Sequence, residues 1–514
     1  MPNISSRSNL GPGFFGTLVL FLLTFFLSCE YGSLYFAMDD EAVTVLGAQR
    51  LLAGETPYRD FATRHCPGSY YFSAAYFAIF GSEQWGTRSL MCLVAALTGL
   101  LIHLISLRCI RGKMRFMPWL LWTCCGLVDF PILSYHWFGT LFTVASVLMA
   151  WGWVTQSSPW WARGLGLSSS LALWTLQSDG FASALIIVFL GLRFRPPNRL
   201  TLLRWTVGCS ILLWLPLFPL WGQIWRESVV DLRIHLPYNR FPYSWHPLIE
   251  MFQANQGIAW TQDPQLWGTA WSHWWLNVLR YGTFYGVLVI SLLFSEWKRH
   301  REGKILAWCM LAWALAIGNR QVISYLGFAC PIYYLVLCQL LSHLPRAGIL
   351  AALWAGIEIL GWGCRASFKV RSHQFPVQTR SGLYWTQSPQ VAQRCALLHA
   401  MVEKYLPPGT EVLGYPYLAS LYTLEKLRNP IRFSVLSPFV FSDEDHRLSV
   451  DRLKERKVRW IVYQALSASA ISRLVRIPEE VYIPEAQRRL EQVTQGYRPV
   501  AGAPGLQLFE RKEP

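Results

Sequence analysis

The stretch MDDEAVTVLGAQRLLAGETPYRDF, residues 38–61, directly follows the first long apolar run of the chain. It begins with three consecutive carboxylates, Asp39, Asp40 and Glu41. Because ionised carboxylates are costly to desolvate at a membrane boundary, a cluster of them there indicates a functional site. A carboxylate at the border of water and lipid can act as a general base toward a hydroxyl or hold a divalent cation.

The residues after the carboxylates have the pattern of a short amphipathic helix. Val45, Ala48 and Leu52 follow helical spacing, and Gly54 comes where a helix would stop. The pattern predicts an interfacial helix over residues 41–53, lying along the membrane with the first two carboxylates near its N-terminus. The helix dipole favours carboxylates there. Helix capping alone would explain one of the three acids but not all of them.

The composition identifies a polytopic α-helical membrane protein. Of the 514 residues 53% are hydrophobic, 26 are tryptophan, and the mean hydropathy is +0.26. A soluble chain of this length would divide into domains and would not need so much apolar surface. Allowing about 20 residues per span, we expect about eleven transmembrane helices. We place them near 14–35, 86–107, 116–128, 138–154, 164–178, 180–194, 203–222, 274–295, 304–318, 322–342 and 347–363.

The net charge of +16 is concentrated in short loops between these spans. Such loops are typical of the cytoplasmic side of a membrane. A nucleic-acid partner is disfavoured, because no basic groove with interleaved aromatic residues lies elsewhere in the chain. We therefore expect a multi-pass protein of the inner (plasma) membrane with a cytoplasmic N-terminus. The three loops contain Arg108, Arg111, Lys113 and Arg115; Arg193, Arg195, Arg199 and Arg204; and Lys298, Arg299, Arg301 and Lys304.

With this orientation further polar residues gather on the outer side with the carboxylate cluster. Asp129, Asp179 and the long loop 223–273 all face that side, which supports a polar site there. The alternative is that the two aspartates only end short hairpins and stay hydrated. His235 and Arg240 in the loop could bind phosphate or a metal, but interfacial residues of these types also commonly anchor a loop at the headgroups.

The composition changes near Cys364, after the last predicted span. Residues 390–406 have a helical pattern and lead into the strand-like 411–416, and residues 451–466 repeat this order. We therefore predict a membrane domain over 1–363, with a first outer loop at 36–85, and an extracytoplasmic α/β domain over 364–514.

A set of acidic, aromatic, proline, glycine and arginine residues recurs through the first outer loop: Asp40, Glu41, Gly54, Pro57, Tyr58, Arg59, Asp60, Phe61, Pro67, Gly68, Tyr70, Tyr71, Gly81 and Arg88. In this pattern the loop resembles that of GT-C fold membrane glycosyltransferases, in particular bacterial members related to protein O-mannosyltransferases and to the aminoarabinose transferase of lipid A. The segments QSDGF, NRQVISYLGFACPIYYLV and PYLASLYTLEKLRNPIRF resemble later parts of the same proteins.

The resemblance implies transfer of a sugar from a polyprenyl-phosphate donor to an acceptor hydroxyl on the outer face, with inversion at the anomeric carbon. It implies Asp40 as general base, with Glu41 orienting it and Asp39 as a third acid beside them. The acceptor would be a glycan, a lipid or a protein. Whether a divalent cation such as Mg²⁺ or Mn²⁺ takes part is left open. We expect the donor phosphate to be bound by arginines, whose planar forks suit phosphate oxygens: Arg59, Arg88 and Arg320.

Two other classes of protein would also carry acids near the membrane. In a secondary transporter such acids would couple ion or proton movement, but transporters usually have two related halves, and this sequence has no matching half. A scaffold protein could keep the same fold without catalysis. In that case replacing Asp40 would leave the cellular phenotype unchanged.

Overall fold

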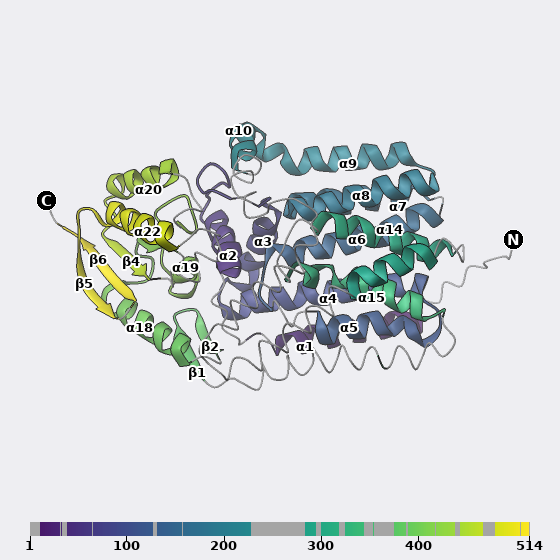
Figure 1. The fold of residues 1–514 in the computed structure, drawn as a ribbon, viewed down its shortest axis with the longest axis horizontal. Helices are drawn as coiled ribbons and strands as arrows, with labels where there is room; N and C mark the ends of the chain where they lie inside the picture. The colour runs from purple at the N-terminus through teal and green to yellow at the C-terminus, as the bar shows by residue number, and fades with distance from the viewer. Residues whose placement is uncertain are drawn as a thin grey trace.

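The computed structural model describes residues 11–30, 32, 39–63, 65–126, 131–156, 158–227, 283–294, 300–317, 324–343, 353, 375–386, 389–416, 418–436, 443–465, 479–503 and 505–512. A bundle of long helices forms one end of the molecule, and a smaller part with strands and helices forms the other (Figure 1). Two shorter helices, α2 (Asp39–Leu52) and α3 (Gly68–Phe80), lie between them.

Helices lie at each predicted span up to 322–342, whereas the last one, near 347–363, falls almost wholly outside the described residues. Four described stretches are long and apolar enough to cross a membrane: Gln84–Cys109, Tyr135–Thr155, Gln177–Phe194 and Arg199–Trp225. The bundle consists of α1 (Gly11–Cys29), α4 (Gln84–Cys109), η1 (Gly112–Phe116), α5 (Met117–Cys125), α6 (Tyr135–Thr155), α7 (Pro159–Thr175), α8 (Gln177–Phe194), α9 (Arg199–Trp214), η2 (Leu215–Leu220), α10 (Trp221–Trp225), Thr283–Phe294, α14 (Arg301–Ile317) and α15 (Ser324–Leu341).

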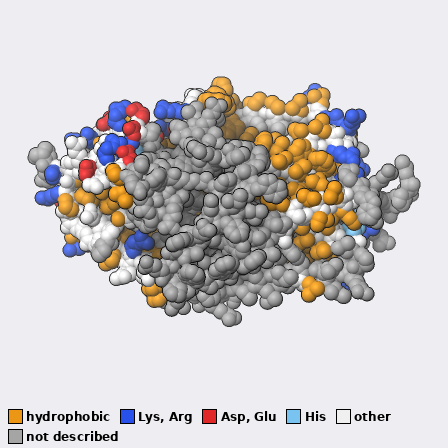
Figure 2. Space-filling view, in the orientation of Figure 1, with side chains coloured by type: hydrophobic (Ala, Val, Ile, Leu, Met, Phe, Trp, Pro, Cys, Tyr) orange, Lys and Arg blue, Asp and Glu red, His pale blue; other side chains and the backbone are white. Residues whose placement is uncertain are grey.

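The outer surface of the bundle is apolar. On α9 only Leu202 is buried, while Leu203, Ile211 and Leu212 are each more than half exposed. In Figure 2 hydrophobic side chains cover much of the described surface of the helical end, with Lys and Arg side chains at its far tip, and acidic and basic side chains lie together at the other end. Soluble proteins rarely expose apolar patches of this extent, so the bundle is suited to a lipid environment.

The helix predicted after the first span is confirmed as α2, which begins at Asp39 and ends at Leu52. Gly54 follows with a φ of +83°, a left-handed conformation that glycine adopts without strain. That α2 lies along the membrane stays a prediction, and the structure adds which parts of the protein the helix contacts. Its Val45 belongs to the core of the bundle, whereas Leu46 packs into the core of the C-terminal part. The helix therefore joins the two parts of the protein.

The C-terminal part contains a four-stranded sheet in the order β3-β4-β6-β5. The two predicted helix-then-strand units are confirmed, and their strands β3 and β4 pair in parallel. The antiparallel pair β5 and β6 was not predicted, and a separate hairpin of β1 and β2 lies before α18. The elements are β1 (Phe375–Thr379), β2 (Gly382–Thr386), α18 (Pro389–Tyr405), β3 (Val412–Tyr415), α19 (Ala419–Leu424), α20 (Asp443–Glu455), β4 (Trp460–Gln464), α22 (Glu479–Thr494), β5 (Tyr497–Ala503) and β6 (Leu506–Arg511).

Candidate functional site

Two of the predicted site residues, Glu41 and Arg88, meet where the first turns of α2 and α4 come together. Arg88 Nη2 donates a hydrogen bond of 2.9 Å to Glu41 Oε2, and Arg88 Nη1 donates one of 2.9 Å to the carbonyl of Pro131. The N–H of Leu133 donates to Glu41 Oε1 at 3.1 Å. The Arg88 side chain is 4% exposed and that of Glu41 is 15% exposed. Both oxygens of Glu41 are thus engaged, and Arg88 holds a carboxylate.

Burial raises the pKa of Glu41 above its ordinary value, although Arg88 and the Leu133 N–H both favour the ionised form. Tyr384 of β2 lies beside the pair, with its ring centroid 5.9 Å from Arg88 Cζ. Burial also raises the pKa of Tyr384, which keeps its phenol protonated at neutral pH. A cavity of about 30 Å³ lies here, lined by residues of α2, α4, β2 and α19. The bundle and the C-terminal part therefore both contribute to the surroundings of Glu41.

Most of the other predicted site residues lie outside the described part of the chain. The backbones of Asp39 and Asp40 form the start of α2, but their side chains are outside the description. The residues that are outside it altogether are Asp129, Arg320, His235 and Arg240.

Asp179 lies inside the bundle, in the first turn of α8. Its side chain is buried, and its Oδ1 accepts a hydrogen bond of 3.1 Å from Thr143 Oγ1 of α6. A Cβ at Gly139 would lie 2.8 Å from Asp179 Oδ2, so this glycine leaves room for the carboxylate. Asp179 does not line the small cavity beside Glu41.

Arg59 projects from a tight turn between α2 and α3. Tyr58 before it is fully buried at a φ of +67°, and the N–H of Thr56 donates to Asp60 Oδ2 at 2.7 Å. Arg59 is 59% exposed and pairs with the neighbouring Asp60 at 2.8 Å. Arg59 does not line the cavity beside Glu41. In this structure the Pro-Tyr-Arg-Asp-Phe motif shapes the loop.

Sequence reasoning missed Arg50, which ties α2 to the C-terminal part. Its Nε pairs with Glu55 Oε2 at 2.6 Å, and its Nη1 donates to the carbonyl of Ile431 at 3.0 Å. Its Nη2 donates to the carbonyl of Asp60 at 3.0 Å, and its Cζ lies 4.9 Å from the ring centroid of Phe61. The side chain is 7% exposed. The helical pattern of the sequence could only place Arg50 on α2.

A second missed contact joins Arg432 to Glu227, the last described residue after α10. Arg432 Nη2 pairs with Glu227 Oε1 at 2.8 Å, and the N–H of Thr63 donates to Glu227 Oε2 at 3.0 Å. Arg432 belongs to the RNPIRF segment, so the resemblance of that segment was a signal for it. For Glu227, which lies near the start of the predicted long loop 223–273, we find no signal in the sequence.

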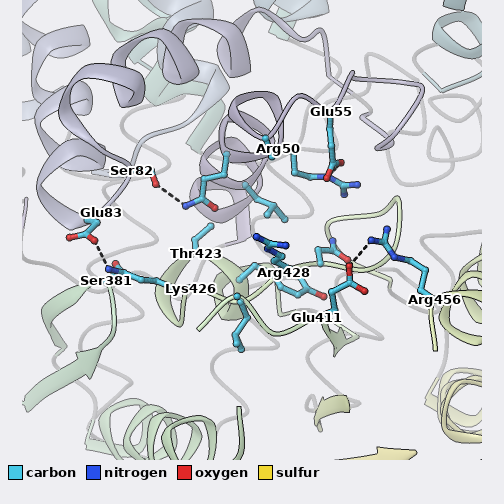
Figure 3. Close-up of a pocket in the computed structure, with 17 residues that line it drawn as sticks. Arg50, Glu55, Ser82, Glu83, Ser381, Glu411, Thr423, Lys426, Arg428 and Arg456 are labelled. Carbon is cyan, nitrogen blue, oxygen red and sulfur yellow. Dashed lines mark hydrogen bonds and ion pairs between the residues drawn. The ribbon is translucent and has the colours of Figure 1, made fainter. Parts of the chain in front are cut away.

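A larger cavity of about 600 Å³ lies between α2 and the C-terminal part (Figure 3). Its walls come from one face of α2, from residues 82–83 before α4, and from residues 409–411 and 422–429. It shares Ser82, Ser381 and Thr423 with the small cavity beside Glu41. The two cavities are therefore neighbours along one side of α2.

The described residues do not make up a metal site. No group of three or more His, Cys, Asp or Glu side chains that could hold an ion lies within the described ranges. The side chains of Asp39 and Asp40 are not among those searched. We therefore derive no step through a divalent cation.

No protein-family model matches the chain, and no curated protein matches it in sequence. Solved structures do match it. For ArnT from Cupriavidus metallidurans in the apo state the TM-score is 0.59 at 11% identity, over 97% of this chain and 98% of that one. For the Archaeoglobus fulgidus oligosaccharyltransferase in complex with Zn and sulfate it is 0.53 at 11% identity, over 96% of this chain and 73% of that one.

The archaeal oligosaccharyltransferase AglB from Archaeoglobus fulgidus, in complex with an inhibitory peptide and a dolichol-phosphate, matches with a TM-score of 0.52 at 11% identity. That match covers 98% of this chain and 75% of the other. At such low identity the likeness concerns the fold, and it extends over both the bundle and the C-terminal part. The chain therefore has the GT-C fold of these membrane glycosyltransferases.

Proposed function

We propose that this protein is an integral membrane glycosyltransferase that moves a sugar from a polyprenyl-phosphate donor to an acceptor hydroxyl on the outer face of the membrane. The observation that carries the proposal is the buried Arg88–Glu41 pair, held at 2.9 Å in the first turn of α2 beside the cavities between bundle and C-terminal part. The GT-C fold supports it, because ArnT and the oligosaccharyltransferase share that fold. The dolichol-phosphate bound to AglB supports a lipid-phosphate donor.

In the proposed reaction Asp40 takes the proton of the acceptor hydroxyl as that oxygen bonds to the anomeric carbon. The bond from this carbon to the phosphate oxygen breaks, and its electron pair leaves with the polyprenyl phosphate. A single displacement of this kind inverts the anomeric centre. Asp40 is the neighbour of Glu41 in the first turn of α2, where the helix dipole favours an ionised carboxylate.

Glu41 acts in this proposal as a positioning residue. Its two oxygens accept from Arg88 and from the Leu133 N–H, which ties the first turn of α2 to α4 and to the segment before α6. Arg88 thereby orients the acids, and a phosphate would have to compete with Glu41 for its guanidinium. We therefore assign the donor phosphate to Arg320 among the predicted arginines, with Arg59 at the exposed loop as the second candidate.

The test compares wild type with Asp40→Asn after purification and reconstitution into lipid vesicles. Each is given a panel of polyprenyl-phosphate sugars and a membrane extract as acceptor, and release of polyprenyl phosphate is measured. Asp451→Asn on α20 is the matched control, because its exposed carboxylate lies away from both cavities. We expect turnover in wild type and the control and its loss in Asp40→Asn.

Equal turnover in wild type and Asp40→Asn would refute the assignment of the base. Absence of turnover with every donor would favour the two alternative functions, a secondary transporter or a scaffold protein without catalysis. Coupled ion flux across the vesicle membrane would then point to a transporter, and an unchanged cellular phenotype of Asp40→Asn to a scaffold.

A further inference from the structure

The larger cavity between α2 and the C-terminal part has both polar and apolar walls and no assigned ligand. It encloses about 600 Å³, within the range of sites that hold small molecules. Hydroxyl and amide side chains make up much of the wall beside α2 and α19: Gln49, Ser82, Ser381, Thr423 and Asn429. Groups of this kind suit the many hydroxyls of a carbohydrate better than the apolar side chains of a peptide or the acyl chains of a lipid.

Backbone hydrogen bonds fix the segment that carries the exposed side chains of Lys426 and Arg428. The N–H of Gly409 donates to the carbonyl of Lys426 at 2.8 Å, and the N–H of Arg428 donates to the carbonyl of Thr410 at 2.9 Å. The N–H of Val412 donates to the carbonyl of Arg428 at 3.1 Å. Residues 426–428 therefore run along the start of the edge strand β3. These hydrogen bonds fix the backbone position from which the Arg428 side chain extends.

The charges of the cavity wall do not balance. Its three glutamates each pair with a basic residue: Glu55 with Arg50 at 2.6 Å, Glu411 with Arg456 at 2.5 Å, and Glu83 with Lys426. Arg428 is the fourth basic residue of the wall. Its guanidinium has no acidic partner within the described ranges, and Figure 3 shows it between Arg50 and Glu411.

The pair of Lys426 and Glu83 can give way to a ligand. The side chains are 43% and 62% exposed, and exposed ion pairs contribute little to stability. An anion beside Arg428 would therefore gain the Lys426 ammonium as a second cation at small cost. An arginine fork binds a carboxylate or a phosphate with two parallel hydrogen bonds.

We propose that this cavity is the acceptor subsite, and that it takes a carbohydrate carrying a carboxylate or phosphate group, which Arg428 binds. The acceptor's reacting hydroxyl lies in the small cavity beside Glu41, which the glycan enters past Ser82, Ser381 and Thr423. The inference rests on the proposed function and adds the class of acceptor. It assigns recognition of the acceptor's charge to the C-terminal part, away from the reacting centre.

The test measures binding to the full-length protein in lipid nanodiscs by titration calorimetry. The ligands are cellobiose, cellobiouronic acid, cellobiose 6-phosphate and inorganic phosphate. The variants are Arg428→Gln and Arg428→Lys, with Arg447→Gln on α20 as a matched loss of one exposed guanidinium away from the cavity.

We expect the acidic disaccharides to bind wild type at least about tenfold more tightly than cellobiose. Arg428→Gln should abolish that difference, Arg428→Lys should keep part of it, and Arg447→Gln should keep all of it. Equal binding of acidic and neutral disaccharides by wild type would overturn the proposal, as would full discrimination by Arg428→Gln. Inorganic phosphate binding as tightly as cellobiose 6-phosphate would show an ion site without sugar recognition, which also overturns it.

The result is separable from the fate of the proposed function. Release of polyprenyl phosphate is measured on the same preparations. Selective binding without turnover of any donor would contradict the transferase proposal and leave the anionic carbohydrate site standing. Turnover without selective binding would contradict the subsite alone.

Discussion

Replacing Arg88 by methionine should destabilise the protein through the carboxylate that it leaves behind. The Glu41 side chain is 15% exposed, and among the described residues it would keep only the N–H of Leu133 as a partner. Removing one partner of a buried ion pair costs about 3–5 kcal/mol. Protonation of Glu41 limits this loss of stability, because a neutral side chain no longer buries a charge. At about pH 7.3 protonating a glutamate with an ordinary pKa of about 4.3 costs about 4 kcal/mol. We therefore expect a loss of about 3–4 kcal/mol for Arg88→Met near neutral pH.

This loss should depend on pH. Burial already raises the pKa of Glu41, and removal of Arg88 raises it further. When folding raises the pKa of a carboxyl group, the group contributes most to the stability of the fold at a pH below its pKa in the unfolded chain. That contribution is lost as the pH rises through the pKa in the folded protein. Lowering the pH from about 7.3 to about 5.3 should therefore recover up to about 2.7 kcal/mol in Arg88→Met. Glu41→Gln/Arg88→Met, which has no ionisable group there, should show no such recovery at this site.

The assay is reversible unfolding in mixed dodecylmaltoside and SDS micelles, followed by the fluorescence of the 26 tryptophans. Arg447→Met is the control for the loss of an arginine elsewhere, since it lies exposed on α20, and its stability should match wild type. The double variant should be more stable than Arg88→Met near neutral pH. A double variant no more stable than Arg88→Met, or a loss that does not shrink at low pH, would refute the view that Arg88 compensates a buried Glu41.

Two further changes test how the parts of the protein are joined. Arg432→Met removes one described partner of the buried Glu227, so it should destabilise the contact by about 2 kcal/mol and speed proteolytic release of the C-terminal part. Adding Glu227→Gln should slow that release again, and unchanged proteolysis would contradict the role of the pair. Gly47→Ala would bring a Cβ to 2.6 Å from Tyr70 Cδ1 and should cost about 1–3 kcal/mol. Gly16→Ala is the control, because a Cβ there meets open space, and it should keep the midpoint of thermal unfolding of wild type. Equal unfolding midpoints for Gly47→Ala and Gly16→Ala would mean that α2 and α3 pack less closely than described.

Local signals in the sequence were enough to predict the helices of the bundle. Each long apolar run carries its own hydropathy, so the positions of helices such as α4, α6 and α8 need no knowledge of their neighbours. The same holds for α2, whose periodic apolar residues and following Gly54 were visible in the sequence. The helix-then-strand units of α18 with β3 and α20 with β4 also show local periodicity.

The sequence by itself therefore determined that the chain is a helical membrane protein and that its first outer loop carries acids and arginines. The tertiary structure decided which of these groups meet. Glu41 and Arg88 are 47 residues apart, and Arg50 donates to a carbonyl 381 residues away. Hydropathy and periodicity act over a few neighbouring residues, whereas the partner of a buried charge depends on which elements pack together. For that reason the pairing of Arg88 with Glu41 was not predicted, and the cavity around Arg428 emerges only when the C-terminal part packs against α2.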